Sequence, residues 1–127
     1  MADLKMKILI VDDFSTMRRI IKNILRQFGY VNILEADDGA TALDALKIEK
    51  INFIISDWNM PQLSGIELLK AVRGSEEWKE IPFLMVTAEG QKEHVLEAVK
   101  FKVNNYIIKP FTAETLIEKI NNIFEPK

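Results

Sequence analysis

The sequence contains no cysteine and has little excess charge of either sign. The absence of cysteine excludes disulfides, thiolate metal sites and a cysteine nucleophile, and it is compatible with a reducing cytoplasm. A formal net charge of -2 gives no basic field that would attract nucleic acid or an anionic membrane surface. The apolar run near the amino terminus is too short for a signal peptide or a membrane span, and two acids follow it. We therefore expect a soluble, cytoplasmic protein that binds neither nucleic acid nor a membrane.

Low-complexity segments and linkers are absent as well, so nothing in the sequence indicates a second domain. With 127 residues, 48% of them hydrophobic and 28% charged, the chain has the size and composition of one ordinary globular domain. We expect residues 1–127 to form a single domain that acts as a monomer. Any activity or partner binding must then use the surface of this one domain.

Apolar runs of strand length alternate with longer segments of helical period. Residues 14–29, for example, place Met17, Ile21 and Leu25 on one helical face, and this pattern ends at Gly29. Strands are expected over residues 7–13, 31–36, 51–57, 81–87 and 105–110. Helices are expected over residues 14–29, 40–47, 65–73, 92–101 and 112–124. The alternation predicts an α/β fold: a doubly wound, five-stranded parallel sheet in a (βα)5 arrangement with helices on both faces.

Reactive side chains stand at the ends of four of the five expected strands. Asp12 and Asp13 follow the first strand, and Asp57 ends the third. Thr87 ends the fourth strand, and Lys109 lies near the end of the fifth. Because the carboxyl ends of parallel strands meet at one edge of the sheet, these side chains should converge. Asp12 and Asp13 alone could simply cap the first helix. Core packing does not require reactive side chains at four strand ends, so we interpret the whole set as a functional site.

The flavodoxin-like strand order 2-1-3-4-5, taken from known folds of this type, would make the three aspartates neighbours. Two carboxylates 4 Å apart repel by roughly 4 kcal/mol at an effective dielectric of about 20, so such a cluster must take up a proton or bind a cation. Lys109 can offset one charge, and oxygen-only ligands with an open side favour Mg²⁺. A hydroxyl, an ammonium and nearby backbone amides suit a phosphoryl group, and a carboxylate can itself be the nucleophile that forms an aspartyl phosphate.

Four segments of the chain resemble motifs of the two-component receiver domain: VDDFSTMRRI, SDWNMP, MVTAE and YIIKPF. DWNMP and KPFT are more specific than the general receiver signature, and nearly the entire chain is similar to CheY-like chemotaxis response regulators. The resemblance implies a stand-alone response regulator of two-component phosphorelay signalling that controls the flagellar motor. It also implies a regulator that assists its own phosphorylation and dephosphorylation and is not an enzyme with an external substrate.

The resemblance, and not the spacing, selects one aspartate as the phosphoacceptor, namely Asp57. It implies that the cofactor is Mg²⁺, that Asp13 binds the ion directly and that Asp12 acts largely through water. The backbone carbonyl of Asn59 would be the third protein ligand. Trp58 and Pro61 would shape the turn that offers this carbonyl.

The resemblance also implies how the phosphoryl group is held and sensed. Thr87 and the backbone amide of Ala88 would hold phosphoryl oxygens, and Lys109 would pair with another. On phosphorylation Thr87 would move toward the phosphoryl group and Tyr106 would turn inward behind it. Without the resemblance, Tyr106 would be interpreted as an ordinary amphipathic strand residue with its hydroxyl at the surface.

A partner-binding face is expected over the fourth helix, the fifth strand and the last helix. Its candidate residues are Val95, Val99, Val103, Tyr106, Ile108 and Lys119. Burial in the core is the competing interpretation for the two helix valines, which lie at positions i and i+4. The implied partners are a CheA-like sensor histidine kinase, a flagellar motor switch protein and a phosphatase. His94, the only histidine, is expected to be a solvated helix residue and neither a ligand nor a phosphate carrier.

Two positions depart from the family pattern. Ser64 stands before Gly65 where Asp or Asn is frequent, and serine remains chemically reasonable in that turn. Lys102 stands where a glycine usually follows the fourth helix, so the end of that helix is expected to be reshaped.

Two other classes of protein, a phosphohydrolase and a binding module, are alternatives, and a third, an electron carrier, is disfavoured. A haloacid-dehalogenase-like phosphohydrolase also uses an aspartate at a strand end, but its pattern needs acids separated by one residue, whereas Asp12 and Asp13 are adjacent. A flavodoxin-like electron carrier is disfavoured, because no Ser/Thr/Gly-rich phosphate loop follows the first strand. The second alternative is a receiver-like binding module that is never phosphorylated.

Overall fold

The computed structural model describes residues 3–88 and 92–125 as five strands and five helices that alternate along the chain. The strands are β1 (Lys7–Val11), β2 (Asn32–Ala36), β3 (Phe53–Asp57), β4 (Phe83–Ala88) and β5 (Asn105–Lys109). The helices are α1 (Ser15–Gln27), α2 (Gly39–Ile48), α3 (Gly65–Arg73), α4 (Lys92–Lys100) and α5 (Ala113–Phe124). Every expected element is present, and its bounds agree with the expected ones to within a few residues.

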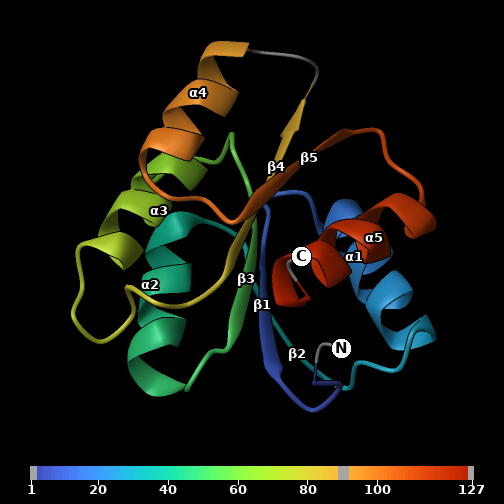
Figure 1. The fold of residues 1–127 in the computed structure, drawn as a ribbon. Coiled ribbons are helices and arrows are strands. Elements are labelled where there is room, and N and C mark those ends of the chain that lie inside the picture. The colour runs from blue at the N-terminus through green and yellow to red at the C-terminus, as the bar shows by residue number, and fades with distance from the viewer. Residues whose placement is uncertain (1–2, 89–91, 126–127) are drawn as a thin grey trace.

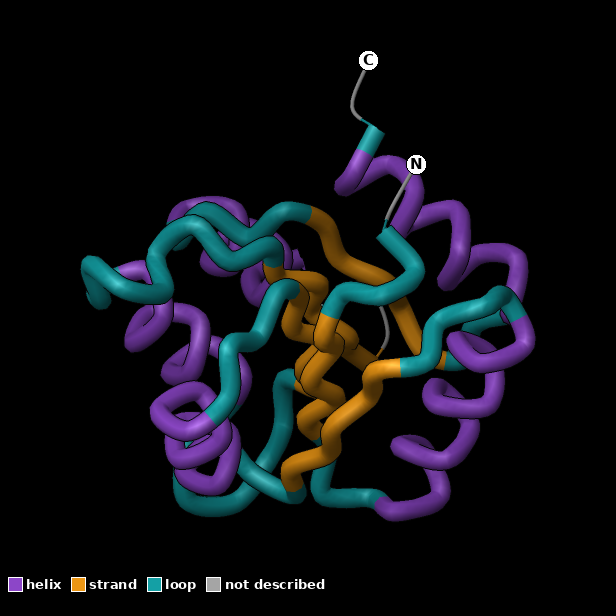
Figure 2. The backbone as a smooth tube through the Cα atoms, turned by 90° about the horizontal axis from the view of Figure 1, so that it is seen from below, coloured by secondary structure: helices purple, strands orange, loops and turns teal. Residues whose placement is uncertain are grey.

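The strands form one parallel sheet in the order β2-β1-β3-β4-β5, so the predicted fold class is confirmed. Helices α2, α3 and α4 cover one face of the sheet, and α1 and α5 cover the other (Figure 1). The view from below shows the strands between these two helical layers (Figure 2). All five carboxyl ends therefore point to the same edge of the sheet.

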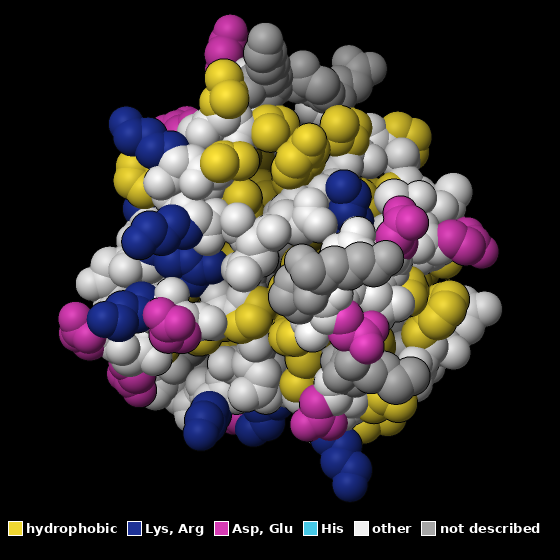
Figure 3. Space-filling view, viewed as in Figure 1, with side chains coloured by type: hydrophobic (Ala, Val, Ile, Leu, Met, Phe, Trp, Pro, Cys, Tyr) yellow, Lys and Arg dark blue, Asp and Glu magenta, His cyan; other side chains and the backbone are white. Residues whose placement is uncertain are grey.

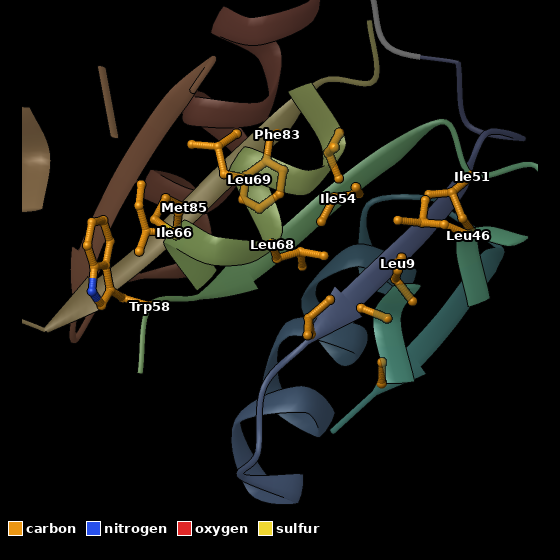
Figure 4. Packing of buried hydrophobic residues seen from close by; sticks show 14 of the residues in the cluster. Leu9, Leu46, Ile51, Ile54, Trp58, Ile66, Leu68, Leu69, Phe83 and Met85 are labelled. Carbon is orange, nitrogen blue, oxygen red and sulfur yellow. The ribbon is translucent and has the colours of Figure 1, made fainter. Parts of the chain in front are cut away.

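The sheet separates two hydrophobic clusters, because successive side chains of a strand point to opposite faces. In β1, Leu9 and Val11 belong to the cluster under α2 and α3, and Ile8 and Ile10 belong to the cluster under α1 and α5. Figure 4 shows the first cluster, where Phe83, Leu69 and Ile54 pack between the sheet and α3. Burying an aliphatic or aromatic side chain of this size contributes roughly 1.5–3 kcal/mol, so the central strands are held rigidly.

Helix ends follow local sequence signals. Gly29 ends α1 with a left-handed φ of 101°, as the sequence predicts. Ser64 forms a capping box at the start of α3, in which its hydroxyl accepts from Glu67 and the Glu67 carboxylate accepts from the Ser64 amide. Lys102 adopts a left-handed φ of 66°, so this chain keeps the glycine-like backbone after α4. The expectation of a reshaped helix end is therefore wrong: Lys102 and Val103 donate to the last turn of α4.

None of the helices within residues 3–88 and 92–125 combines the length and the apolar content that crossing a membrane would require.

Candidate functional site

The carboxyl edge of the sheet brings the three aspartates together. β1 and β3 are neighbours, with Val11 opposite Ser56, so the next residues, Asp12 and Asp57, meet at the strand ends. One carboxylate oxygen from each of Asp12, Asp13 and Asp57 lies within 4.8 Å of the others. The predicted convergence of these carboxylates is thus a feature of the fold.

Two of the three carboxylates are almost removed from solvent. Asp12 is 1% exposed and Asp57 is 7% exposed, whereas Asp13 lies at the surface. Burial raises the pKa of Asp12 above its ordinary value of 3.8. Burial, together with the neighbouring charge of Asp12, raises the pKa of Asp57 in the same direction. Ionised forms of both groups are therefore costly unless a cation balances them.

Lys109 supplies one positive charge from the end of β5. Its Nζ lies 3.0 Å from Oδ1 of Asp57 and 3.6 Å from Oδ2 of Asp12. Among the described residues, Oδ2 of Asp12 is the one buried side-chain polar atom with no hydrogen-bond partner. An acceptor that is buried without a donor costs free energy, and a bound cation would remove that cost.

The donor set at this edge fits a divalent cation. Asp13 and Asn59 line an open hollow of about 420 Å³ together with Met60, Pro61 and Ser64. Carboxylates and backbone carbonyls are the hard oxygen ligands that Mg²⁺ prefers, and an open side leaves room for waters or a phosphate oxygen. No nitrogen or sulfur ligand belongs to the three-residue cluster, so the chemistry of a softer metal is not favoured.

Thr87 and Ala88 end β4 on the other side of Asp57. In the register of β3 and β4, Asp57 pairs with Val86, so the buried Thr87 lies one residue beyond it. The Thr87 hydroxyl donates weakly to the Ala88 carbonyl at 3.4 Å, and Ala88 pairs with Lys109 on β5. A hydroxyl and an ammonium thus lie on the two strands next to the acid cluster. The loop after β4, which would offer further backbone amides, begins with residues 89–91, outside the described residues.

Trp58, the residue after Asp57, is buried and makes a contact that the sequence did not predict. The imidazole of His94 on α4 stacks on its indole, with 4.2 Å between ring centroids and 9° between planes. The expectation that His94 is simply solvated is therefore wrong. A single histidine at a half-buried helix position gives no sequence signal for such a contact, because the partner is 36 residues away in the chain.

Gly65 allows α3 to begin directly against the acid cluster. A β-carbon at this position would lie 2.2 Å from the backbone carbonyl oxygen of Asp57, which is closer than any side chain permits. The Gly65 amide donates to the carbonyl of Trp58 at 2.8 Å. The turn that contains Asn59 is therefore closed tightly at both ends, and this role of Gly65 was not recognised from the sequence.

The candidate switch and partner residues lie beyond β4. Tyr106 is half-buried against the cluster under α2 and α3, and the Lys119 ammonium lies 5.1 Å from the centre of its ring. Val99 is 58% exposed and Ile108 is 39% exposed, so core burial does not account for Val99. Val95 and Val103 are half-buried. Hydrophobic atoms gather over α4 and β5 on this side of the molecule (Figure 3).

Asp57→Asn is expected to raise the free energy of unfolding at pH 7 by on the order of 1 kcal/mol, because it removes one of two crowded buried charges. The folded-state pKa of Asp57 lies above its ordinary value, so the folded protein holds the proton more tightly than the unfolded chain. The penalty on the folded state is fully present above the folded pKa and is relieved as the pH falls through it. The stability gain of the variant should therefore shrink on acidification.

Urea denaturation of the parent and the variant at several pH values measures this difference in unfolding free energy. Asp44→Asn, at an exposed position on α2, is the matched control and should change stability little at any pH. A variant that is no more stable than the parent at pH 7 would contradict the unfavourable environment assigned to Asp57.

Comparison with known families adds an independent finding to this geometry. The family model of the response regulator receiver domain matches residues 8–121. Chemotaxis protein CheY-3 of Vibrio cholerae is 59% identical over 120 residues, which cover 94% of this chain and 92% of that protein. Chemotaxis protein CheY of Pseudomonas aeruginosa is 58% identical over 120 residues, which cover 94% of this chain and 97% of that protein.

Solved structures with the same arrangement of elements also come from this group. The chemotaxis response regulator CheY4 of Vibrio cholerae superimposes with a TM-score of 0.87 at 34% identity, covering 94% of this chain and 98% of that one. A response regulator receiver domain protein from Clostridium thermocellum superimposes with a TM-score of 0.83 at 30% identity, covering 93% of each chain.

Proposed function

We propose a signalling function for this chain, which belongs to the response regulator receiver domain family. It is a CheY-type regulator of chemotaxis and not an enzyme that acts on an external substrate. In the proposed function it is a stand-alone response regulator of a two-component phosphorelay and accepts a phosphoryl group on Asp57 in a Mg²⁺-dependent reaction. The observation that carries this proposal is the buried Oδ2 of Asp12, which accepts no hydrogen bond and shares the single ammonium of Lys109 with Asp57.

The proposed reaction forms one bond and breaks one bond. A carboxylate oxygen of Asp57 attacks the phosphorus of a small phosphodonor or of a phosphorylated kinase histidine, and the donor's bond to phosphorus breaks with its electron pair leaving on the donor. Asp57 is well placed because the last residue of a fully buried strand is held rigidly. The ordinary alternative role for a buried carboxylate is a structural ion pair. Here one ammonium faces two buried carboxylates, and Oδ2 of Asp12 still accepts no hydrogen bond.

Asp12, Asp13, Asp57 and the backbone carbonyl of Asn59 would hold Mg²⁺, with Asp13 as a direct ligand and Asp12 acting largely through water. The ion would supply positive charge against the negative charge that builds up on the transferred group. Without it, Lys109 is the single cation within salt-bridge reach of the cluster in the described part of the chain.

The chain's own donors would hold the transferred group. The Lys109 ammonium, now 3.0 Å from Oδ1 of Asp57, would pair with one phosphoryl oxygen. The Thr87 hydroxyl, whose present bond to the Ala88 carbonyl is long at 3.4 Å, is easily redirected to a second oxygen. The backbone amide of Ala88 would also donate to a phosphoryl oxygen.

The signal would leave through the face formed by α4, β5 and α5. Redirection of Thr87 opens space behind it for the half-buried Tyr106, which is the proposed switch. The proposed partner-binding face consists of Val95, Val99, Val103, Tyr106, Ile108 and Lys119. The exposed apolar surface of Val99 and Ile108 supports this choice. The proposed partners are a sensor histidine kinase, a flagellar motor switch protein and a phosphatase.

Incubation of the protein with acetyl phosphate tests the proposed function. With Mg²⁺ present, intact-mass measurement is expected to show the addition of one phosphoryl group, and the group should be lost on standing as an acyl phosphate hydrolyses. Removal of Mg²⁺ with EDTA should reduce the rate of uptake by at least about tenfold, because the charge on the transferred group is then balanced by Lys109 alone.

Three outcomes would count against the proposal. A protein that takes up no phosphoryl group with Mg²⁺ would be a receiver-like binding module. Uptake that is unaffected by EDTA would mean that the acid cluster is not a metal site. Steady turnover of a chromogenic phosphate ester would instead indicate a phosphohydrolase, which the comparisons do not support.

A further inference from the structure

Arg18 on α1 contacts the acid cluster from behind. Its Nη1 donates to the backbone carbonyl of Asp12 at 2.5 Å, and its Nε donates to Oε1 of Glu35 on β2 at 3.0 Å. The Arg18 side chain is 17% exposed; its bond to the Asp12 carbonyl is partly buried, and its bond to Glu35 lies at the surface. Lys22, one helical turn further along α1, donates to the other oxygen of Glu35 at 3.1 Å. One carboxylate thus holds two cations, and of these two Arg18 is the one that reaches Asp12.

Glu35 is suited to act as an anchor. Burial alone would raise its pKa, but hydrogen bonds from Lys22 and Arg18 outweigh burial and lower the pKa below the ordinary value. Glu35 therefore stays ionised well below neutral pH and holds the planar guanidinium by a charge-assisted bond.

The contacts of Asp12 leave one of its polar atoms without a hydrogen bond. Its amide donates to the carbonyl of Ala36 at 3.1 Å, its Oδ1 accepts from the amide of Phe14 at 2.8 Å, and its carbonyl accepts from Arg18. These partners come from β2, from the start of α1 and from the body of α1. The remaining atom is Oδ2, which faces the cluster and has no hydrogen-bond partner.

The carbonyl that Arg18 holds belongs to the peptide bond between Asp12 and Asp13. Because a peptide unit is planar, fixing the direction of its carbonyl also fixes the direction in which the Cα of Asp13 leaves. Within residues 3–88 and 92–125, the exposed side chain of Asp13 makes no hydrogen bond or ion pair that would orient it. The orientation of its carboxylate therefore depends on how firmly this peptide is held.

We propose that Arg18, anchored by Glu35, is a positioning residue for the Mg²⁺ site and orients the Asp12–Asp13 peptide so that both carboxylates face the same ion. This inference rests on the proposed function, because it assumes that the cluster binds Mg²⁺. Arg18 touches neither the ion nor the phosphoryl group in this account. It acts through the main chain.

Electrostatics and positioning predict opposite changes in Mg²⁺ affinity when the Arg18 guanidinium is removed. Loss of a nearby cation alone would strengthen Mg²⁺ binding. Loss of orientation would weaken it, and supporting contacts behind metal ligands are typically worth about 10–100-fold in affinity. Arg18→Met keeps an apolar stem of similar length but has no donor. Lys22→Met is the matched control, since it removes the same charge from the same helix and the same anchor without touching Asp12.

The measurement is a Mg²⁺ titration at constant ionic strength that follows the fluorescence of Trp58, which adjoins Asp57. A Trp78→Phe background removes the second tryptophan. Arg18→Met is expected to weaken Mg²⁺ binding by at least about tenfold, and Lys22→Met to leave it unchanged or slightly tighter. Arg18→Lys should restore part of the loss, because an ammonium can reach the carbonyl but cannot bridge it to Glu35.

Urea unfolding of each variant separates positioning from general stability. A purely structural role would lower the unfolding free energy of Arg18→Met and leave the Mg²⁺ affinity of its folded form unchanged. Binding as tight in Arg18→Met as in Lys22→Met overturns the inference and leaves the proposed function standing. No saturable response in the parent, or an unaltered response in Asp13→Ala, overturns the inference together with the proposed metal site.

Discussion

Asp57→Asn is expected to abolish uptake of phosphate from acetyl phosphate, with at least about a thousandfold loss of labelling, because an amide is no nucleophile. The change is nearly isosteric and places a neutral group in a site where burial and the charge of Asp12 already disfavour the anion. The fold should therefore survive intact. Loss of labelling with a native circular dichroism spectrum would assign the chemistry to this one carboxylate.

Asp37→Asn is the matched control for this experiment. Asp37 directly follows β2, at the same edge of the sheet, but it does not belong to the carboxylate cluster and its side chain accepts a hydrogen bond from Thr41. Labelling of this variant should equal that of the parent. If Asp57→Asn is still labelled, and the label withstands acid, the phosphoryl group is on another residue and the aspartyl phosphate assignment fails.

Lys109→Arg is expected to separate acceptance of the phosphoryl group from the response to it. The ammonium lies 3.0 Å from Asp57 and 3.6 Å from Asp12, and its side chain is only 21% exposed. Arginine keeps the charge, so phosphorylation should persist, but a bulky planar fork cannot occupy the place of a compact ammonium. A phosphoryl group adds roughly two negative charges at neutral pH, so a well-placed cation gains much more in the phosphorylated state than without it.

That difference in affinity between the two states is what can shift a conformational equilibrium, because a cation that interacted equally with both would shift nothing. Most of the response at the partner-binding face should therefore be lost in Lys109→Arg. The measurement is NMR of the parent and the variant with and without beryllofluoride as a phosphoryl mimic. The expected result is a bound mimic with strongly reduced shifts at Tyr106 and Val99.

Lys119→Arg is the control for the added bulk and planarity of arginine near the β5 edge of the sheet. Lys119 lies 5.1 Å from the ring of Tyr106 and makes a cation–π contact that arginine can also make. The response of the Lys119→Arg variant to beryllofluoride should match that of the parent protein. Should Tyr106 and Val99 shift as fully in Lys109→Arg as in the parent, Lys109 is only an electrostatic anchor, and the coupling runs through Thr87.

The order of the elements and the identity of the groups at the strand ends could be predicted from the amino-acid sequence. Alternating apolar periods are local, so runs such as β3 could be recognised from neighbouring residues alone. Parallel strands place their carboxyl ends at one edge of the sheet, so Asp57, Thr87 and Lys109 could be expected to lie together. The strand order did not come from the pattern. It came from known folds of this type, and the structure confirms it.

The atoms that meet at the site depend on how distant elements pack together. One oxygen of Asp12 accepts no hydrogen bond, and the carbonyl of Asp12 accepts from Arg18, which Glu35 anchors. These contacts depend on how the end of β1 packs with β2 and α1. The stacking of His94 on Trp58 likewise joins two elements distant in sequence. Hydrophobic period cannot encode such contacts, because it specifies which face of an element is buried and not which side chain of another element lies against it.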